Sequence, residues 1–191
     1  RDFCLSRGLG DVYKRQLLRF GDSNAGKEYV TNEKSQKIEL FLDLVESILS
    51  EGEKVVVFSK YRSLQNILDM HLENRFKGIK ICHINGMMDS EKRFEQVRLF
   101  NETNDYNIII ASNAGSEGIN MHSAKYLIEM DIADSYLIQT QRHGRIERAS
   151  SKHDSVFVYQ LVAIGSYDEI ALKVVDKKEK YHTNIIRKKL T

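Results

Sequence analysis

The chain has 191 residues and is 41% hydrophobic, which suits one domain of ordinary size or slightly more. Its net charge of +2 is nearly balanced, so any contact with nucleic acid must come from a local patch rather than an overall basic field. Two cysteines without metal-ligand spacing and the lack of an apolar run near the roughly 18 residues of a membrane span argue for a reduced, cytoplasmic protein with no membrane partner.

The first 34 residues are expected to lie outside the fold. Residues 1–16 show neither a helical nor a strand period, and we interpret them as a foreign or disordered leader, followed by a linker at 17–34. The linker contains Gly21–Lys27, GDSNAGK, which fits the phosphate-binding loop pattern G-x-x-x-x-G-K. However, Glu28 stands where a hydroxyl should reach the metal, and its carboxylate would repel phosphate. We therefore favour the linker and keep a self-contained NTPase as an alternative.

Helices and strands alternate in the next part of the chain. Amphipathic stripes and β-branched runs predict helices at Lys37–Ser50 and Ser63–Leu72 and strands at Lys54–Ser59, Ile79–Ile84 and Asn107–Ala111. A third helix, capped by Asp89 or Ser90, is expected to bury Phe94, Val97 and Phe100. This alternation implies right-handed crossovers, and hence an α/β fold with a mostly parallel central sheet.

The remaining elements complete one predicted domain at 35–165 and a C-terminal helix at 166–191. Apolar runs predict strands at Tyr126–Met130 and Val156–Ile164, and Ser166–Lys189 is expected to form a long terminal helix that is rich in lysine near its end.

Polar residues follow three of the predicted strands at the point where each strand ends. They are Ser59-Lys60-Tyr61, Asn85-Gly86 and Ser112-Asn113. In parallel sheets the ligand-binding edge lies outside the carboxyl ends of the strands. We therefore expect these three segments to lie side by side at one edge.

The segment from Gln141 to Arg148 predicts a phosphate-binding surface. If it is helical, Gln141, Arg145 and Arg148 share one face, at spacings of four and three residues. Two arginines and an amide then form a fork-shaped donor surface that suits phosphate oxygens. Gly144 would cost about 1 kcal/mol inside a helix, which suggests a close approach of backbone or nucleotide there.

Four segments in this order, between about Ser35 and Tyr167, resemble motifs of the second RecA-like lobe of superfamily-two helicases, and above all the Swi/Snf-type helicase C-terminal domain. They are Lys54–Ser59, the first strand motif; Ile84-Asn85-Gly86 with Arg93 and Phe100-Asn101, the "DG…R…FN" segment; Ala111–Asn120, which contains Gly-Ile-Asn; and Gln141-x-x-x-Arg145-x-x-Arg148, the arginine-finger motif. The resemblance implies a RecA-like three-layer αβα sandwich. Ser135-Tyr136 and Ala149-Ser150 depart from the pattern of eukaryotic remodellers, and the variant is more similar to a phage or bacterial member.

The resemblance also implies an ATP site. It suggests that Arg148, with Arg145 beside it, acts as an arginine finger on the phosphates, while Gln141 is a polar contact. Asn120 matches the position that contacts the nucleotide ribose, and Gly118 permits close approach of a ligand.

A second implied site grips the backbone of a nucleic-acid strand without reading bases. Its residues are Ser59, Asn85, Gly86, Ser112 and Asn113. By resemblance the partner is double-stranded DNA. Three of the six histidines, His83, His122 and His143, show no metal-ligand geometry, and no metal site is expected on this chain.

Neither a credible phosphate loop nor a metal-binding acidic box is found, and both belong to the first lobe of this family. We therefore expect this chain to be the C-terminal motor lobe of an ATP-dependent DNA helicase or translocase. The ATP, with Mg²⁺ held mainly by a missing N-terminal RecA-like lobe, would sit between the two lobes, so this chain alone would be inactive. The alternative is a non-catalytic nucleic-acid-binding or interaction module that retains the lobe fold.

Overall fold

The structure is a computed structural model that describes residues 35–113, 117–147, 153, 155–163 and 166–178, together with the backbone of 5–6 and 179–189. The Gly21–Lys27 pattern lies outside the described residues. The leader and linker boundaries stay predictions.

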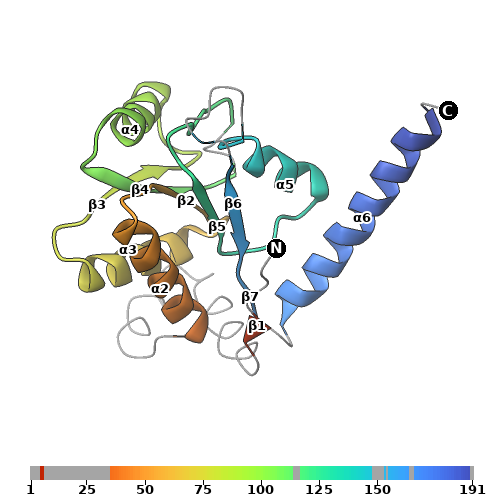
Figure 1. The fold of residues 1–191 in the computed structure, drawn as a ribbon, viewed down its shortest axis with the longest axis horizontal. Helices are drawn as coiled ribbons and strands as arrows, with labels where there is room; N and C mark the ends of the chain where they lie inside the picture. Colours follow the sequence, from red (N-terminus) through yellow and green to blue (C-terminus); the bar gives the residue numbers. More distant parts are fainter. Residues whose placement is uncertain are drawn as a thin grey trace.

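Five parallel strands form the central sheet, in the spatial order β3-β4-β2-β5-β6 (Figure 1). Their bounds are β2 (Val55–Phe58), β3 (Lys80–Ile84), β4 (Tyr106–Ala111), β5 (Tyr126–Glu129) and β6 (Phe157–Gln160). The β-branched strand β2 is central and fully buried, and Val56 pairs with Ile109 of β4 and Leu127 of β5.

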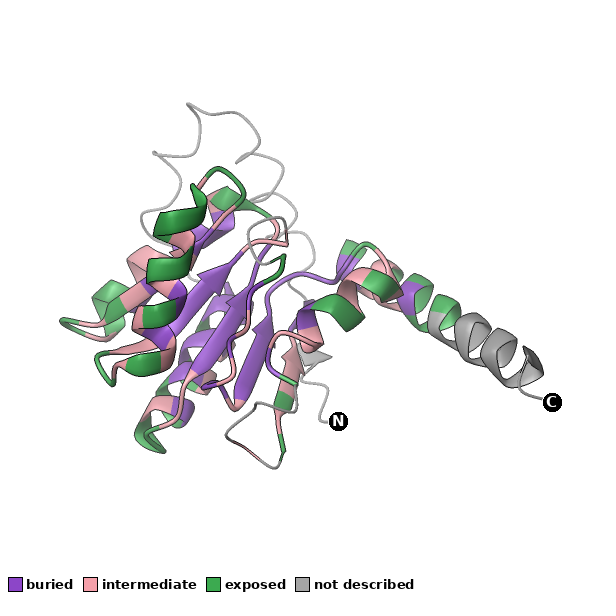
Figure 2. Ribbon diagram, turned by 90° about the horizontal axis from the view of Figure 1, so that it is seen from above, coloured by how far each residue is buried: buried purple, intermediate pink, exposed green. Residues whose placement is uncertain are grey.

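Helices cover both faces of this sheet. Their bounds are α2 (Gln36–Ser50), α3 (Arg62–Arg75), α4 (Ser90–Glu102), α5 (Tyr136–His143) and α6 (Tyr167–Lys189). Side chains alternate along β2, so Val55 and Val57 pack with α2 and α3, whereas Val56 and Phe58 pack with α4. Figure 2 shows the buried strands between the half-exposed helices. The predicted three-layer αβα sandwich with a parallel sheet is confirmed.

Local signals explain where α2 and α4 begin and end. The Ser35 hydroxyl accepts a hydrogen bond from the backbone N–H of Ile38 at 3.3 Å, and the Asp89 carboxylate accepts one from Lys92 at 2.8 Å. Gly52, with φ of 73°, lies just beyond the end of α2, where the left-handed conformation favours glycine. The helix ends predicted from these residues are therefore close to the observed ones.

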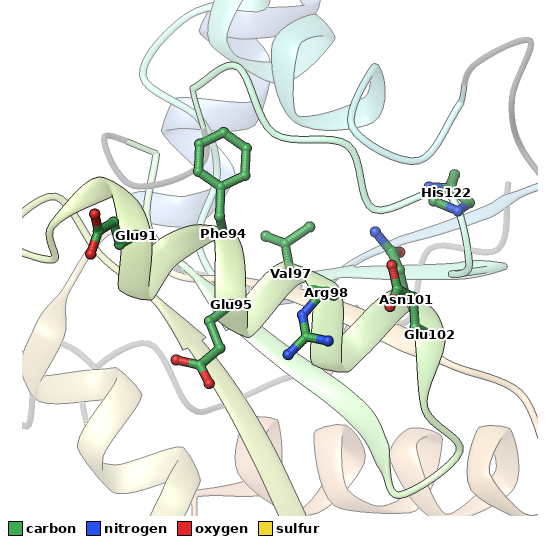
Figure 3. Close-up of a pocket in the computed structure, with 8 residues that line it drawn as sticks. All are labelled: Glu91, Phe94, Glu95, Val97, Arg98, Asn101, Glu102 and His122. Carbon is green, nitrogen blue, oxygen red and sulfur yellow. The ribbon is translucent and has the colours of Figure 1, made fainter.

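The predicted burial of Phe94 is wrong. Val97 and Phe100 pack against the sheet, but the Phe94 side chain is 70% exposed and lines a shallow depression with Glu95, Arg98 and His122 (Figure 3). Residues spaced by three fall about 60° behind one another per step on an α-helix, so Phe94 lies about 120° away from the direction of Phe100. Phe94, the first of the three apolar positions, therefore lies outside the buried face.

The prediction of a helix across Gln141–Arg148 is also wrong in its bounds. Helix α5 begins earlier, at Tyr136, because Ser135 caps it by accepting from the Ile138 N–H at 3.3 Å. It ends at His143, and Gly144 is the C-cap residue, with φ of −64° and ψ of −2°. Gly144 therefore ends the helix rather than interrupting it. The next two residues form a turn, in which the N–H groups of Arg145 and Ile146 donate to the carbonyls of Arg142 and His143, each at 3.1 Å.

The strand predicted at Val156–Ile164 is two strands. After β6 the chain continues as β7 (Val162–Ala163), which pairs in parallel with β1 (Leu5–Ser6) in a separate two-stranded sheet. The interruption falls at Leu161, whose N–H donates to the carbonyl of Glu129 at 3.0 Å. Strand β1 lies within the segment that the sequence places outside the fold.

A buried ion pair fastens α6 to the start of the domain. The Lys37 ammonium lies 2.6 Å from the Asp168 carboxylate, and these side chains are 3% and 10% exposed. Burial lowers the pKa of Lys37, while Asp168 opposes this shift. Farther along, α6 runs away from the sheet in both ribbon views (Figures 1 and 2). The first turn of α6 is thus part of the packed domain.

Replacing Asp168 by Asn should destabilise the fold by about 3 kcal/mol, because it removes the carboxylate that lies 2.6 Å from a buried ammonium. Urea denaturation measures the change in the free energy of unfolding. As a matched control on the same helix, Lys173→Ala breaks an exposed pair with Glu169 and should change stability by less than about 0.5 kcal/mol. Equal effects of the two substitutions would contradict this assignment.

The same pair makes stability depend on pH. The pKa of Lys37 is lower in the folded chain than the roughly 10.4 of an unfolded lysine, so between these values the unfolded chain binds more protons. The contribution of Lys37 to stability therefore rises as the pH increases from the folded pKa of Lys37 towards the unfolded value. In Asp168→Asn that rise should be steeper than in the original chain, as measured by urea denaturation at several pH values.

Candidate functional site

The sheet brings the three polar strand exits together at its carboxyl edge. The Ser59 N–H donates to the carbonyl of Ala111 at 3.1 Å, and the Ser112 N–H donates to the carbonyl of Ile84 at 2.9 Å. These bonds join the ends of β2, β4 and β3 in their spatial order. The predicted arrangement of the exits side by side is present.

The five residues predicted to grip nucleic acid differ in exposure. Gly86 is exposed, and Asn85, Ser112 and Asn113 are half-buried. Ser59, in contrast, is 0% exposed, and its hydroxyl bonds to the carbonyl of Tyr61 at 3.4 Å. Ser59 is therefore a buried residue at the end of β2, while the other four residues lie at or near the surface.

The loop that ends in Gly-Ile-Asn is held at its far end. Gly118 has φ of 73°, a conformation that favours glycine, and is exposed. Ile119 is buried in the core, and the carbonyl of Asn120 accepts a hydrogen bond from the Asn101 side chain at 2.9 Å. Asn101, part of the quoted "FN" motif, thus positions the residue expected at the ribose.

The same loop end lies against Arg145. The Met121 N–H donates to the carbonyl of Arg145 at 2.9 Å, and the Arg145 guanidinium lies 3.5 Å from the carbonyl of Ile119. Gln141 is exposed on α5. Because α5 ends at His143, Gln141 and Arg145 do not share a helical face, contrary to the prediction. Arg148 lies outside the described residues.

Arg142, which no sequence motif singled out, is 2% exposed and is the largest of the fully buried side chains in the described part of the chain. Its Nε donates to Asn113 Oδ1 at 2.7 Å. Nη1 donates to the Asp131 carbonyl at 2.9 Å and to Glu129 at 3.2 Å, and Nη2 donates to the Asp131 carboxylate at 3.0 Å. The guanidinium also lies 5.4 Å from the centre of the Phe58 ring. All three nitrogens of this side chain are therefore bonded.

The two carboxylates beside Arg142 hold further parts of the edge. The Asp131 carboxylate also accepts from the backbone N–H of Lys60 at 2.7 Å, and Glu129 accepts from Gln160 at 2.6 Å. Burial raises the pKa of Asp131 although Arg142 opposes it. Burial acts in the same sense on Glu129, but His143 and Arg142 outweigh it and hold the pKa of Glu129 below its ordinary value. Glu129 is thus kept as an anion inside the fold.

One signal in the sequence could have revealed this network. Glu129 lies in β5, a strand with every residue buried, and a carboxylate there needs a cation or several donors. Periodicity alone does not say which arginine supplies that charge. The pairing of Glu129 and Asp131 with Arg142 emerges only from the fold.

Searches for other features of a site give negative results in the part of the chain that the structure describes. No group of three or more His, Cys, Asp or Glu side chains there could hold a metal ion. None of the described helices is long and apolar enough to cross a bilayer.

Comparison with protein families gives a match to the helicase conserved C-terminal domain over residues 36–150. The chain belongs to this family. The matched residues include the strand exits, the Gly-Ile-Asn loop and the arginine segment. All parts of the candidate site therefore lie within the helicase C-terminal domain.

Curated relatives support the Swi/Snf-type assignment. The chain is 29% identical over 140 residues to the DNA excision repair protein ERCC-6-like of Homo sapiens, a stretch that covers 72% of this chain and 11% of that protein. It is 24% identical over 154 residues to the ATP-dependent helicase/translocase YwqA of Bacillus subtilis, covering 81% of this chain and 16% of that protein. The helicase C-terminal domain described here thus spans only a small part of the length of these relatives.

A solved structure confirms the RecA-like fold. The core of the Sulfolobus solfataricus SWI2/SNF2 ATPase, solved in complex with double-stranded DNA, superposes with a TM-score of 0.70 at 20% identity, over 93% of this chain and 37% of that chain. At this level of identity the likeness shows the fold of the helicase C-terminal domain.

Substituting Gly118 by Ala should cost about 1–2 kcal/mol of stability, because an alanine pays for the left-handed conformation there. Gly144→Ala is the matched control. Its backbone is already helical, and the added Cβ would meet the carbonyl oxygens of Thr140 at 3.3 Å and Gln141 at 3.7 Å, so the cost should be smaller. Thermal unfolding of both variants tests the order, and a larger loss for Gly144→Ala would refute it.

Proposed function

We propose that this chain is the second motor lobe of an ATP-driven DNA helicase or translocase that works in the cytoplasm. The main support for the proposal is that the polar strand exits and the arginine segment lie together at the carboxyl edge of the sheet. The polar strand exits lie there, and Arg142 bonds directly to one of them, Asn113, while Arg145, three residues farther on, holds the Gly-Ile-Asn loop. An edge of this kind can serve a nucleotide and a nucleic-acid strand at the same time.

In the proposed mechanism the arginines act on ATP that another lobe holds. Phosphoryl transfer to water needs charge neutralised on the equatorial oxygens, and a positioned arginine supplies this. Arg148 is the finger, Arg145 lies beside it, and Gln141 is an exposed polar contact. Gly118 and Asn120 face the nucleotide from the neighbouring loop. The upstream N-terminal RecA-like lobe supplies the phosphate loop and most of the ligands to Mg²⁺.

The proposed nucleic-acid partner is double-stranded DNA. Asn85, Gly86, Ser112 and Asn113 offer amides and short polar side chains, which suit phosphate contacts that carry no sequence information. The names of the relatives, which include repair proteins and a helicase/translocase, support this choice, as does the DNA-bound Sulfolobus core. The nearly neutral net charge fits a local grip rather than a broad basic surface.

When the chain is joined to its upstream lobe, Arg148→Ala and Arg145→Ala should each reduce DNA-stimulated ATP hydrolysis, by about 10³-fold for the finger. Arg75→Ala is the matched control. Arg75 is at the end of α3, at the opposite edge of the sheet, where it pairs with Asp43 and Glu46. Turnover is measured at saturating DNA. Full activity in Arg148→Ala would overturn the finger, and no ATP hydrolysis by the unsubstituted protein would favour a non-catalytic binding module.

Placing a carboxylate at the strand exits should weaken DNA binding. Ser112→Glu adds a negative charge beside the expected phosphates. The DNA concentration for half-maximal ATP hydrolysis should therefore rise about tenfold or more, and this rise should be larger at low salt. Ser50→Glu adds the same charge at the exposed end of α2 and should have little effect. Equal shifts in the two variants would mean that the exits do not contact DNA.

A further inference from the structure

The buried guanidinium of Arg142 links two parts of the proposed site. Its side chain donates to Asn113, which directly follows the end of β4. Its own backbone carbonyl accepts from the Arg145 N–H at 3.1 Å, just beyond the end of α5. Arg142 therefore bonds through its side chain to Asn113, which is predicted to contact nucleic acid, and through its backbone to Arg145, which is predicted to contact ATP.

We propose that Arg142 is a positioning residue that transmits the state of the nucleic-acid edge to the arginine segment. This inference rests on the proposed function and goes beyond it, because it assigns a role in coupling to a residue that touches neither ATP nor DNA. When a nucleic-acid strand shifts Asn113, the rigid planar guanidinium shifts with it and carries the end of α5 along.

The surroundings of Arg142 make this link stiff. Asp131 receives two bonds from the guanidinium, one at its carbonyl and one at its carboxylate, and it holds the N–H of Lys60 as well. The ends of β5 and β2 are thus tied to the same group. A buried network in which each of the three guanidinium nitrogens is hydrogen-bonded has few alternative arrangements, so a displacement at one end reaches the other.

Lysine cannot replace arginine in this role. A guanidinium donates from three separate nitrogens in one plane, whereas an ammonium donates from a single point. Arg142→Lys keeps a positive charge beside Glu129 and Asp131 but cannot reproduce the bond from Nε to Asn113 together with those from Nη1 and Nη2. Arg142→Lys therefore tests geometry rather than charge.

The test is a double-mutant cycle in the full-length protein. Arg142→Lys, Asn113→Ala and the double variant are compared by their maximal ATP hydrolysis rate at saturating double-stranded DNA. Each single variant should lose about tenfold or more, because small displacements of catalytic groups are costly, and the double variant should lose little further. Arg142→Lys combined with Asn85→Ala is the control. The Asn85 side chain accepts from the Met87 N–H and is not a partner of Arg142, so adding Asn85→Ala should raise the DNA concentration for half-maximal stimulation and leave the maximal rate of Arg142→Lys unchanged.

Asn113→Ala also separates positioning from simple DNA contact if Arg142→Lys does not fold. A residue that only touches DNA would raise the DNA concentration for half-maximal stimulation and leave the maximal rate unchanged, which would overturn the inference. A fall in the maximal rate supports it. Multiplying losses of Arg142→Lys and Asn113→Ala would also overturn it. If the unsubstituted full-length protein shows no DNA-stimulated hydrolysis, the proposed function itself fails, which is a distinguishable result.

Discussion

The cost of burying one guanidinium is the constraint on which the functional edge of this domain depends. Arg142 has almost no contact with water, so its charge must be met by protein groups or the fold loses several kcal/mol. Those groups are Asn113, Glu129 and Asp131, from the ends of two parallel strands. The hydrogen bonds of Arg142 therefore fix the positions of the residues at the ends of β4 and β5. They also hold α5 against the sheet.

Much of the architecture could be predicted because it follows from local and periodic signals. A continuous β-branched run such as Val55–Phe58 is typical of a strand that is buried on both faces. An amphipathic stripe such as that of α2 is typical of a helix that packs on a sheet. The errors fall where periodicity is weak. Phe94 lies off the buried face of α4. The start of α5 depends on its N-cap Ser135 and the end on its C-cap Gly144, so the helix does not extend over the arginine segment.

The candidate site could be predicted only in part. Ser59, Asn85 and Ser112 lie together because strand ends in a parallel sheet must, and their neighbourhood required no knowledge of side-chain contacts. Arg142 escaped because a charged residue on a short helix is normally solvated, and its partners are 11 to 29 positions away in the chain. The roles of Arg145, Arg148 and Gln141 stay predictions, since the wall of the cleft that they would face belongs to another lobe.

The Lys37–Asp168 pair has a consequence for how the chain folds during synthesis. Its two members are 131 residues apart, so the ammonium near the start of α2 does not meet the Asp168 carboxylate until the beginning of α6 has been made. At about 5–20 residues per second, the ribosome needs roughly 7–26 s to cover that distance. During this interval the strands can pair and the helices can pack. Burial of the Lys37 ammonium, however, costs more free energy until the Asp168 carboxylate is in place. The beginning of α6 is thus needed to complete the ion pair at the start of α2.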